Sequence, residues 1–327
     1  MSERCELGVI GVGQLGSRHL QALARLNRPA RVHVVDPVPA ALERACARFA
    51  EVAANDGRVE LVLADDIAQL PRKLAAVVVA TNADHRATVI DRLLQHTSVP
   101  YLVLEKVLFQ RDGDYGDIAD RLERAGSRAW VNCPRRLFEG YRTLRQRLSA
   151  GGPIEYRVQG DGWGLACNSI HFVDHAAFLS RRDDFRMTAV QLEPGCNPSK
   201  RAGYVEFFGT VRGEFGDGSR ISMTCRAEGT QPLSIQVLAA DGRYDFDESQ
   251  AAIRWTPTAT GETESFPLVP TYQSQLTQLV IQDLLDHGTC GLTPYAESVR
   301  LHRPLLAAFL GHYRTHADAG AESCPIT

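Results

Sequence analysis

The sequence predicts an α/β chain of two domains: a doubly wound parallel sheet, then an α+β domain with an open, mostly antiparallel sheet. The chain has 327 residues and 44% hydrophobic content, which is enough for two cores because single domains commonly have about 100–200 residues. Strand and helix patterns alternate as far as Asn132, whereas after Pro153 strand patterns follow one another directly. We place the domains at 1–133 and 134–327.

The first motif is a strand, a glycine turn and a helix. Leu7–Ile10 is apolar, the next residues follow the Gly-x-Gly-x-x-Gly pattern, and Leu15–Leu26 has helical spacing. In a dinucleotide-binding Rossmann turn the first glycine permits the tight turn, the second lets backbone approach a pyrophosphate, and the third allows close helix–strand packing. The helix N-terminus would then face the diphosphate. We assign to cofactor binding Gly11, Gly13, Gln14, Leu15 and Gly16.

A second strand, Arg31–Asp36, ends in a carboxylate 20 residues past Gly16. A dinucleotide fold places there the acid that accepts hydrogen bonds from the adenosine ribose. The charge of Asp36 would repel a 2′-phosphate, so NAD is favoured over NADP. The alternative is an ordinary turn with a surface aspartate.

The rest of the first domain continues the alternation. The expected helices end at Phe49 and near His96 and span about 115–125, and the expected strands are Val59–Leu63, Ala75–Ala80, Tyr101–Leu104 and Ala129–Asn132. The wholly apolar run at 75–80 is typical of a central parallel strand covered on both faces.

Polar residues follow two of these strands at their carboxyl ends, where doubly wound sheets bind ligands. We therefore expect Thr81, Asn82, His85 and Glu105 near the cofactor. Lys106 is either a surface lysine past a strand end or a charge beside the nicotinamide. We favour the second, since a lysine there can stabilise negative charge on the reacting oxygen.

The second domain begins with a helix over Leu137–Leu148, which Gly151-Gly152-Pro153 ends. The Gly216-Asp217-Gly218 turn predicts a hairpin, and we expect the tail Ala317–Thr327 to be loose. The expected strands are Ile154–Gln159, Thr188–Leu192, Val205–Phe215, Arg220–Arg226 and Leu233–Ala239, and the expected helices are Ser169–Leu179, Gln273–Asp286 and Tyr295–His316.

A polar cluster lies on the first of these helices. His171, Asp174 and His175 share one helix face. We assign acid/base work to His171, because imidazole titrates near neutral pH, and we interpret His175 as a core residue. A zinc site on these three is the less favoured alternative, and we predict no metal.

Composition restricts the partners. The net charge is −3 with no Lys/Arg block, so we expect no nucleic-acid partner. No apolar run approaches the roughly 20 residues that span a membrane, and the start Met1-Ser2-Glu3 leads directly into the first strand, which leaves no room for a signal peptide. The eight scattered cysteines include no Cys-x-x-Cys pair, and reduced thiols fit a cytoplasmic protein.

Together these segments resemble the glucose–fructose oxidoreductase and inositol dehydrogenase family, Gfo/Idh/MocA. The likeness covers nearly the whole chain and is carried by Gly11–His19, Ala80–His85, Glu105-Lys106, Asn132–Arg136 and Ser169–Asp174. It implies two-domain oxidoreductases that act on sugars, cyclitols or sugar nucleotides with NAD(H) or NADP(H) and form homodimers or homotetramers through the C-terminal sheet. Lys106 and His171 would match the family's active-site lysine and histidine. We assign to substrate binding Arg136, Trp163, Cys167, Asn168 and Asp174.

Two positions depart from the family pattern. Val107 stands where the family's Glu-Lys-Pro has proline, and Cys167 stands where an aspartate is frequent. A thiol replaces a carboxylate poorly, so proton transfer would rest on Lys106 and His171. Cys167 either lines the pocket or is a buried small hydrophobe, and Asn168 could position a substrate hydroxyl.

The sequence therefore predicts an NAD(H)-dependent dehydrogenase or reductase of a sugar-like secondary alcohol or ketone. One alternative is a cofactor-binding regulatory or scaffold protein without turnover. Another is a reductase of a non-sugar double bond or imine.

Overall fold

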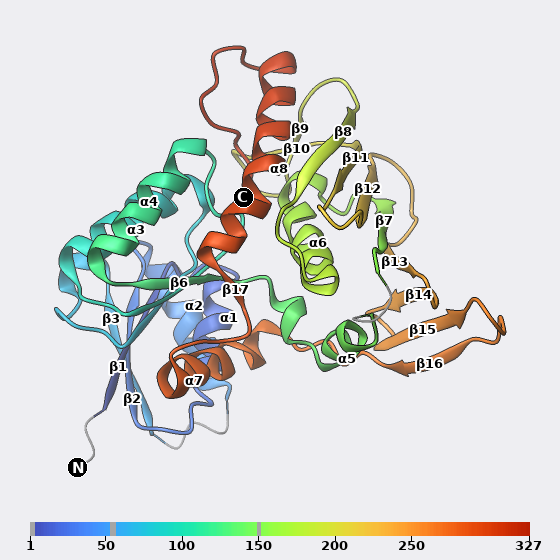
Figure 1. The fold of residues 1–327 in the computed structure, drawn as a ribbon. Coiled ribbons are helices and arrows are strands. Elements are labelled where there is room, and N and C mark those ends of the chain that lie inside the picture. The colour runs from blue at the N-terminus through green and yellow to red at the C-terminus, as the bar shows by residue number, and fades with distance from the viewer. Residues whose placement is uncertain (1–3, 53–56, 149–151) are drawn as a thin grey trace. The chain divides into compact units, whose positions relative to one another are not determined.

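The computed structural model describes residues 4–52, 57–148 and 152–327. Met1, Ser2, Glu3 and Gly151, which the sequence analysis uses, lie outside the described residues. The chain divides into two compact units (Figure 1). Unit 1 comprises 1–109, 113–134 and 271–295, and unit 2 comprises 110–112, 135–270 and 296–327.

Unit 1 is a seven-stranded sheet in the order β17-β6-β5-β4-β1-β2-β3, parallel except for β17. The helices α1 and α2 lie on one face and α3 and α4 on the other (Figure 1), as right-handed crossovers require. The strands are β1 (Cys5–Ile10), β2 (Ala30–Val35), β3 (Val59–Ala64), β4 (Ala76–Val79), β5 (Tyr101–Leu104), β6 (Arg128–Val131) and β17 (Thr293–Pro294). The helices are α1 (Gly16–Leu23), α2 (Pro39–Ala50), η1 (Ile67–Gln69), α3 (Ala83–His96), α4 (Asp112–Ala125), η3 (Gln273–Gln275) and α7 (Thr277–His287).

The local sequence explains this sheet. Every residue of β4 is buried, which fits its all-apolar composition and its place between β1 and β5. α2 begins with Pro39 at its first turn, where the missing N–H costs nothing. The segment 271–295, which the sequence analysis places in the second domain, packs with unit 1 and adds β17 to the edge of its sheet.

Unit 2 is built on an eight-stranded sheet in the order β16-β15-β14-β13-β7-β12-β11-β8, in which only β7 and β12 pair in parallel. A small hairpin joins β9 and β10. The strands are β7 (Glu155–Asp161), β8 (Arg186–Leu192), β9 (Asn197–Pro198), β10 (Val205–Glu206), β11 (Gly209–Glu214), β12 (Arg220–Arg226), β13 (Ser234–Ala239), β14 (Gly242–Asp247), β15 (Ala252–Pro257) and β16 (Glu264–Pro267). The helices are η2 (Pro134–Leu137), α5 (Glu139–Leu148), α6 (Leu165–Ser180) and α8 (Tyr295–His316).

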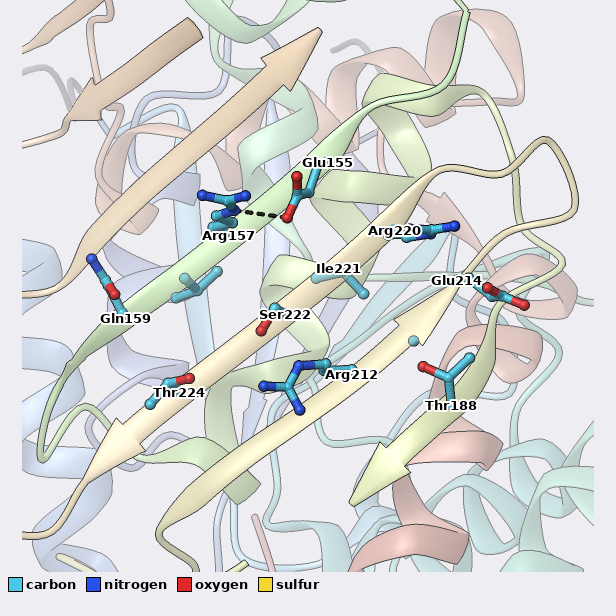
Figure 2. A pocket seen from close by; sticks show the side chains of 12 residues that line it. Glu155, Arg157, Gln159, Thr188, Arg212, Glu214, Arg220, Ile221, Ser222 and Thr224 are labelled. Carbon is cyan, nitrogen blue, oxygen red and sulfur yellow. Dashed lines mark hydrogen bonds and ion pairs between the residues drawn. The ribbon is translucent and has the colours of Figure 1, made fainter. Parts of the chain in front are cut away.

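The central strands of this sheet alternate between a buried and an open face. Tyr156 and Val158 of β7 are buried, while Arg157 and Gln159 between and beyond them are exposed. Figure 2 shows the open face, where side chains of β7, β12, β11 and β8 border a hollow of about 530 Å³. The predicted fold class is thus confirmed in both parts.

Two expectations are wrong in detail. The strand predicted over Val205–Phe215 is two strands, because Gly209 adopts a φ of +120° and breaks the run. A Cβ at Gly209 would lie 2.3 Å from the Gln191 carbonyl oxygen, so only glycine permits this close pairing with β8.

The tail expected to be loose is packed. Cys324 and Ile326 are buried, and the Cys324 N–H donates to the Gln110 carbonyl at 3.0 Å. Gln110 Nε2 donates to the Ile326 carbonyl at 2.9 Å, and the Val205 N–H to that of Pro325 at 2.8 Å. The prediction missed this because the segment lacks periodicity, whereas single apolar residues and backbone hydrogen bonds hold it.

Candidate functional site

The glycine turn of unit 1 contains three glycines with different steric environments. Gly11 has a φ of +82°, and a Cβ there would lie 2.9 Å from the Thr81 backbone nitrogen. A Cβ on Gly16 would lie 1.8 Å from the Gly11 carbonyl oxygen, so that position tolerates no side chain. A Cβ on Gly13 would meet nothing within 4 Å. Gly11 and Gly16 are therefore required by the protein itself, whereas no neighbouring protein atom requires glycine at position 13.

Asp36 follows β2 and connects the strand end to this turn. Its Oδ2 accepts from the Val12 N–H at 2.8 Å and its Oδ1 from the Val38 N–H at 2.9 Å. The residue is 8% exposed, and each carboxylate oxygen keeps a second lone pair for a ligand hydroxyl. The carboxylate is thus fixed in place by two backbone groups.

One pocket of about 550 Å³ collects most of the predicted cofactor residues. Gly11, Gly13 and Asp36 line it together with Thr81, Asn82 and His85. Gln14, Leu15, Gly16 and Glu105 do not line it. The pocket also has lining residues that the sequence analysis missed, notably Asp65, Asp66 and Arg92.

In the sequence, only their position after a strand could have indicated Asp65 and Asp66. Asp65 and Asp66 directly follow β3, the same strand-end position that singled out Thr81 and Asn82 after β4. Arg92 Nη2 donates to both carboxylate oxygens of Asp66, at 3.0 and 2.9 Å. His85 has a mostly exposed side chain, and its Nε2 lies 3.2 Å from Asp84 Oδ2.

Arg86 is a second missed residue, and it holds two strand ends together. Its side chain is fully buried and donates to the carbonyl groups of Thr81, Val107 and Leu108. Arg86 therefore holds in place the backbone segment that follows β4 and the backbone segment that follows Lys106.

Glu105 belongs to a buried hydrogen-bonded ring rather than to the pocket wall. Its Oε1 accepts from His19 Nε2 at 2.9 Å and from Asn132 Nδ2. Gln273 completes the ring: its Oε1 accepts from Asn132 at 2.8 Å, and its Nε2 lies 2.8 Å from Thr277 Oγ1. Thr277 Oγ1 in turn lies 2.9 Å from His19 Nδ1.

The ring fixes an ionised carboxylate beside Lys106. Burial raises the pKa of Glu105, but the hydrogen bonds and charge of His19, with Asn132 and Lys106, lower it below its ordinary value overall. Glu105 Oε2 also accepts from the Lys106 N–H at 3.3 Å. The backbone of the predicted catalytic lysine is therefore attached to a rigid polar network inside unit 1.

In unit 2 the predicted substrate residues gather around the start of α6. Asn168 Nδ2 donates to the Trp163 carbonyl at 2.7 Å, and Trp163 Nε1 donates to the Thr224 carbonyl at 2.9 Å. Cys167 and His171, one helical turn apart, are half-buried. These four side chains thus lie on or just before the first two turns of one helix.

Arg136 and Asp174 instead form a buried ion pair. Arg136 Nε lies 2.8 Å from Asp174 Oδ2, and its Nη2 lies 2.6 Å from Glu297 Oε1. The two carboxylates raise the pKa of Arg136 against the effect of burial. The charge of Arg136 is thus compensated by two carboxylates within unit 2.

His175 is a core histidine, as we interpreted it. It is fully buried, and its Nδ1 lies 2.8 Å from the Tyr156 hydroxyl. Burial, with the charges of Arg135 and Arg136, lowers its pKa well below the ordinary 6.5. Among residues 4–52, 57–148 and 152–327, no group of three His, Cys, Asp or Glu side chains is arranged to hold a metal ion.

Sequence analysis also overlooked Glu206. This buried carboxyl group of β10 accepts from the N–H groups of Ala166 and Phe207 and contacts Cys167. No motif marks it, because a single glutamate in a two-residue strand has no pattern. Only the fold brings it to the first turn of α6.

The comparisons with known proteins agree with this geometry. Residues 5–133 match the model of the oxidoreductase family with an NAD-binding Rossmann fold, GFO_IDH_MocA. No match to a curated protein was found. No helix in the part of the chain that the structure describes is both long and apolar enough to cross a bilayer.

Solved structures match over almost the full length. UDP-N-acetylglucosamine 3-dehydrogenase GnnA from Acidithiobacillus ferrooxidans is 16% identical with a TM-score of 0.68, covering 97% of this chain and 99% of that one. GenD2 from gentamicin A biosynthesis, in complex with NAD, is 18% identical with a TM-score of 0.68, covering 98% and 96%. A super-repressor mutant of Gal80p from Saccharomyces cerevisiae is 11% identical with a TM-score of 0.70, covering 96% and 97%.

At these identities the solved structures establish a shared fold, and the family model adds the identity of the nucleotide-binding part. Of the segments that carry the sequence resemblance in that part, the glycine turn and Ala80–His85 contribute lining residues to the pocket, whereas Glu105 and Asn132 belong to the buried ring. Residues 5–133 therefore match the Gfo/Idh/MocA family of NAD-binding oxidoreductases, and the chain as a whole shares the fold of the GnnA and GenD2 structures.

Proposed function

We propose that the protein is an NAD(H)-dependent oxidoreductase that oxidises a secondary alcohol of a sugar, cyclitol or sugar-nucleotide derivative, or reduces the corresponding ketone. The observation that carries this proposal is the pocket of unit 1, which combines an open space at Gly13 with a fixed carboxylate at Asp36. Support for the substrate class comes from the GnnA structure, whose name specifies a sugar-nucleotide dehydrogenase.

The residues have separate tasks in this proposal. Gly13 and the first turn of α1 would hold the diphosphate, and Asp36 the adenosine ribose. Bound NAD supplies the hydride acceptor. Lys106 would polarise the substrate oxygen, and His171 would exchange the hydroxyl proton, since an imidazole can do so near neutral pH.

NAD is the preferred cofactor in this proposal. Three carboxylates, those of Asp36, Asp65 and Asp66, line the same pocket, and Arg92 is paired with Asp66. A 2′-phosphate would bring further negative charge into this group, at a cost that grows as the site excludes water.

The test is reduction of NAD by the purified protein with a panel of sugars, cyclitols and sugar nucleotides. For an accepted substrate we expect Lys106→Ala to lower kcat at least about 100-fold, as loss of a group that stabilises developing charge does. Lys73→Ala, which changes an exposed lysine shortly before β4, is the matched control. An undiminished rate in Lys106→Ala would remove the lysine from the mechanism.

A regulatory protein that binds NAD without turnover is the second candidate. It is favoured by the structural likeness to Gal80p, whose solved mutant is described as a super-repressor, and by Cys167 in place of an acid. If the protein binds NADH tightly yet no substrate of the panel is ever oxidised or reduced, this candidate replaces the enzyme.

We also propose that a second copy of the chain covers the open face of the sheet in unit 2, giving a homodimer or homotetramer. Arg157, Ser222 and Thr224 point outward there (Figure 2). Sedimentation of Ser222→Arg at a lower mass than the unmodified protein would support this assembly.

The eight cysteines are free thiols, which favours a cytoplasmic location.

A further inference from the structure

Glu206 is a buried acid attached to the first turn of α6. It is 7% exposed, and its Oε1 accepts from the Phe207 N–H at 3.1 Å and from the Ala166 N–H. Both the backbone N–H and the thiol of Cys167 hydrogen-bond to the same carboxyl group. The N-cap residue of α6, Gly164, provides no side-chain cap, so Glu206 supplies from β10 the acceptor that the helix start lacks.

The backbone of Gly164 brings this carboxyl group close to Asn168. Gly164 has a φ of +85°, and a Cβ there would lie 3.1 Å from Glu206 Oε2 and 2.9 Å from Asn168 Nδ2. The carboxyl group therefore hydrogen-bonds to Cys167 and lies near the amide of Asn168, which itself donates to the Trp163 carbonyl. We assign both residues to substrate binding. The position of Glu206 depends on that of the C-terminal segment, because Val205, the preceding residue, pairs with Pro325.

The surroundings of Glu206 are poor in charge. The titratable groups that face it are the thiols of Cys167 on α6, Cys225 on β12 and Cys324 in the C-terminal segment. Burial raises the pKa of Glu206, while the hydrogen bonds from Ala166, Cys167 and Phe207 oppose the rise. An ionised carboxylate here hinders formation of a thiolate at Cys167, because like charges at short range disfavour each other.

We propose that Glu206 is a positioning residue of the substrate site, which orients Cys167 and Asn168 toward a polyhydroxylated ligand and keeps the Cys167 thiol unreactive. The identity of the ligand rests on the proposed function, whereas the effect of Glu206 on the Cys167 thiol does not. The competing explanation is that Glu206 only caps α6. Glutamine separates the two, because it retains an acceptor oxygen for Ala166 and Phe207 and loses the charge.

The test uses Glu206→Gln and Glu206→Ala. The control is Glu193→Gln, which removes an exposed carboxylate that precedes β9, whereas Glu206 follows it. Alkylation of Cys167 by iodoacetamide is followed by peptide mass spectrometry across neutral and mildly alkaline pH, and Cys167→Ser identifies the peptide signal. The melting temperature of each variant shows whether the cap of α6 is still present. For an accepted substrate, KM and kcat are measured for each variant.

We expect Glu206→Gln to melt like the unmodified protein yet to alkylate at Cys167 about tenfold faster at a given pH, as removal of one neighbouring charge predicts. Its KM should rise more than its kcat falls, and Glu206→Ala should lose both the cap and the binding. If Glu206→Gln and Glu193→Gln both alkylate like the unmodified protein, Glu206 is only a helix cap. Alkylation needs no turnover. A protein without dehydrogenase activity would therefore refute the proposed function, while the alkylation rates of Cys167 would still test the role of Glu206.

Discussion

Gly13 and Gly16 show how two glycines of one motif serve different ends. A methyl group on Gly13 meets no protein atom, whereas on Gly16 it collides with the Gly11 carbonyl. We expect Gly13→Ala to change the free energy of unfolding by less than about 0.5 kcal/mol, as at an unconstrained site. It should weaken NADH binding about tenfold or more, because the methyl group takes diphosphate space.

Calorimetric binding and thermal melting check this prediction. Gly16→Ala should unfold unit 1 or destabilise it by about 3 kcal/mol or more, because the clash is with backbone. Gly116→Ala, on α4 and also in open space, is the control that should leave NADH affinity unchanged and raise stability by about 0.5–1 kcal/mol, because alanine is favoured over glycine inside a helix. Unchanged NADH affinity in Gly13→Ala would mean that the turn does not face the diphosphate.

We expect His175 to make unit 2 less stable in acid. Its pKa in the folded protein lies well below the ordinary 6.5 because of burial, so below about pH 6.5 the unfolded chain binds a proton that the folded chain does not. Stability is therefore full above that pH and falls as pH drops, by up to about 1.4 kcal/mol per unit. His175→Gln keeps an acceptor for the Tyr156 hydroxyl and should flatten the slope.

Urea unfolding between about pH 5 and 7 measures that slope. Glu206, whose pKa is raised, acts in the opposite sense, since its contribution is lost as pH rises. Comparing His175→Gln with the unmodified protein cancels Glu206 and all other groups. Equal slopes in the two proteins would show that His175 is not a buried neutral base.

At the scale of elements, the sequence was informative wherever one pattern persisted over a whole element. β4 is uniformly apolar and α3 begins directly after a polar strand end, so both were predictable. β14, β15 and β16 were missed, because residues 242–267 are rich in polar and charged residues and only part of each strand faces a core. Pairing with neighbours that are distant in sequence decides such strands.

The same reasoning applies to the site. Strand-end topology located Asn82 and Asp36, which share a pocket, but it could not separate Glu105, which is buried in the His19 ring, from the pocket wall. Arg136 and Asp174 are polar in sequence and satisfied in the fold. Only tertiary structure shows which polar groups already have partners.

The C-terminal segment provides an element-scale prediction. Ile326 is buried and its carbonyl accepts from Gln110, so Ile326→Ala should cost about 2–4 kcal/mol, as large-to-small core changes do. Glu322→Ala changes a mostly exposed side chain of the same segment and should leave the melting temperature nearly unchanged. Equal melting temperatures for the two variants would mean that the C-terminal segment is loose, as expected from the sequence.

At the scale of the whole molecule, the proposed cofactor pocket and the proposed substrate residues lie in different parts of the chain. The pocket with Gly13 and Asp36 lies entirely in unit 1, and its residues fall within the range matched by the family model. Unit 2 contains His171, Cys167 and Glu206, outside that range. Of the two departures from the family pattern, Cys167 lies in unit 2 and Val107, beside Lys106, lies in unit 1. The proposed catalytic pair, Lys106 and His171, is therefore drawn from both units.

The two dinucleotides should stabilise the folded molecule to different extents. A ligand that binds only the folded state at 100 times its Kd adds about 2.7 kcal/mol to the free energy of unfolding. Because Asp36, Asp65 and Asp66 line the pocket, we expect NADH to raise the melting temperature more than NADPH at equal concentration. Asp36→Asn removes one charge but keeps an acceptor for Val12 or Val38, so it should narrow the difference. Asp120→Asn, an exposed residue of α4, should leave the difference intact. If NADPH stabilises the unmodified protein as much as NADH, the carboxylates do not exclude the 2′-phosphate, and the assignment of NAD fails.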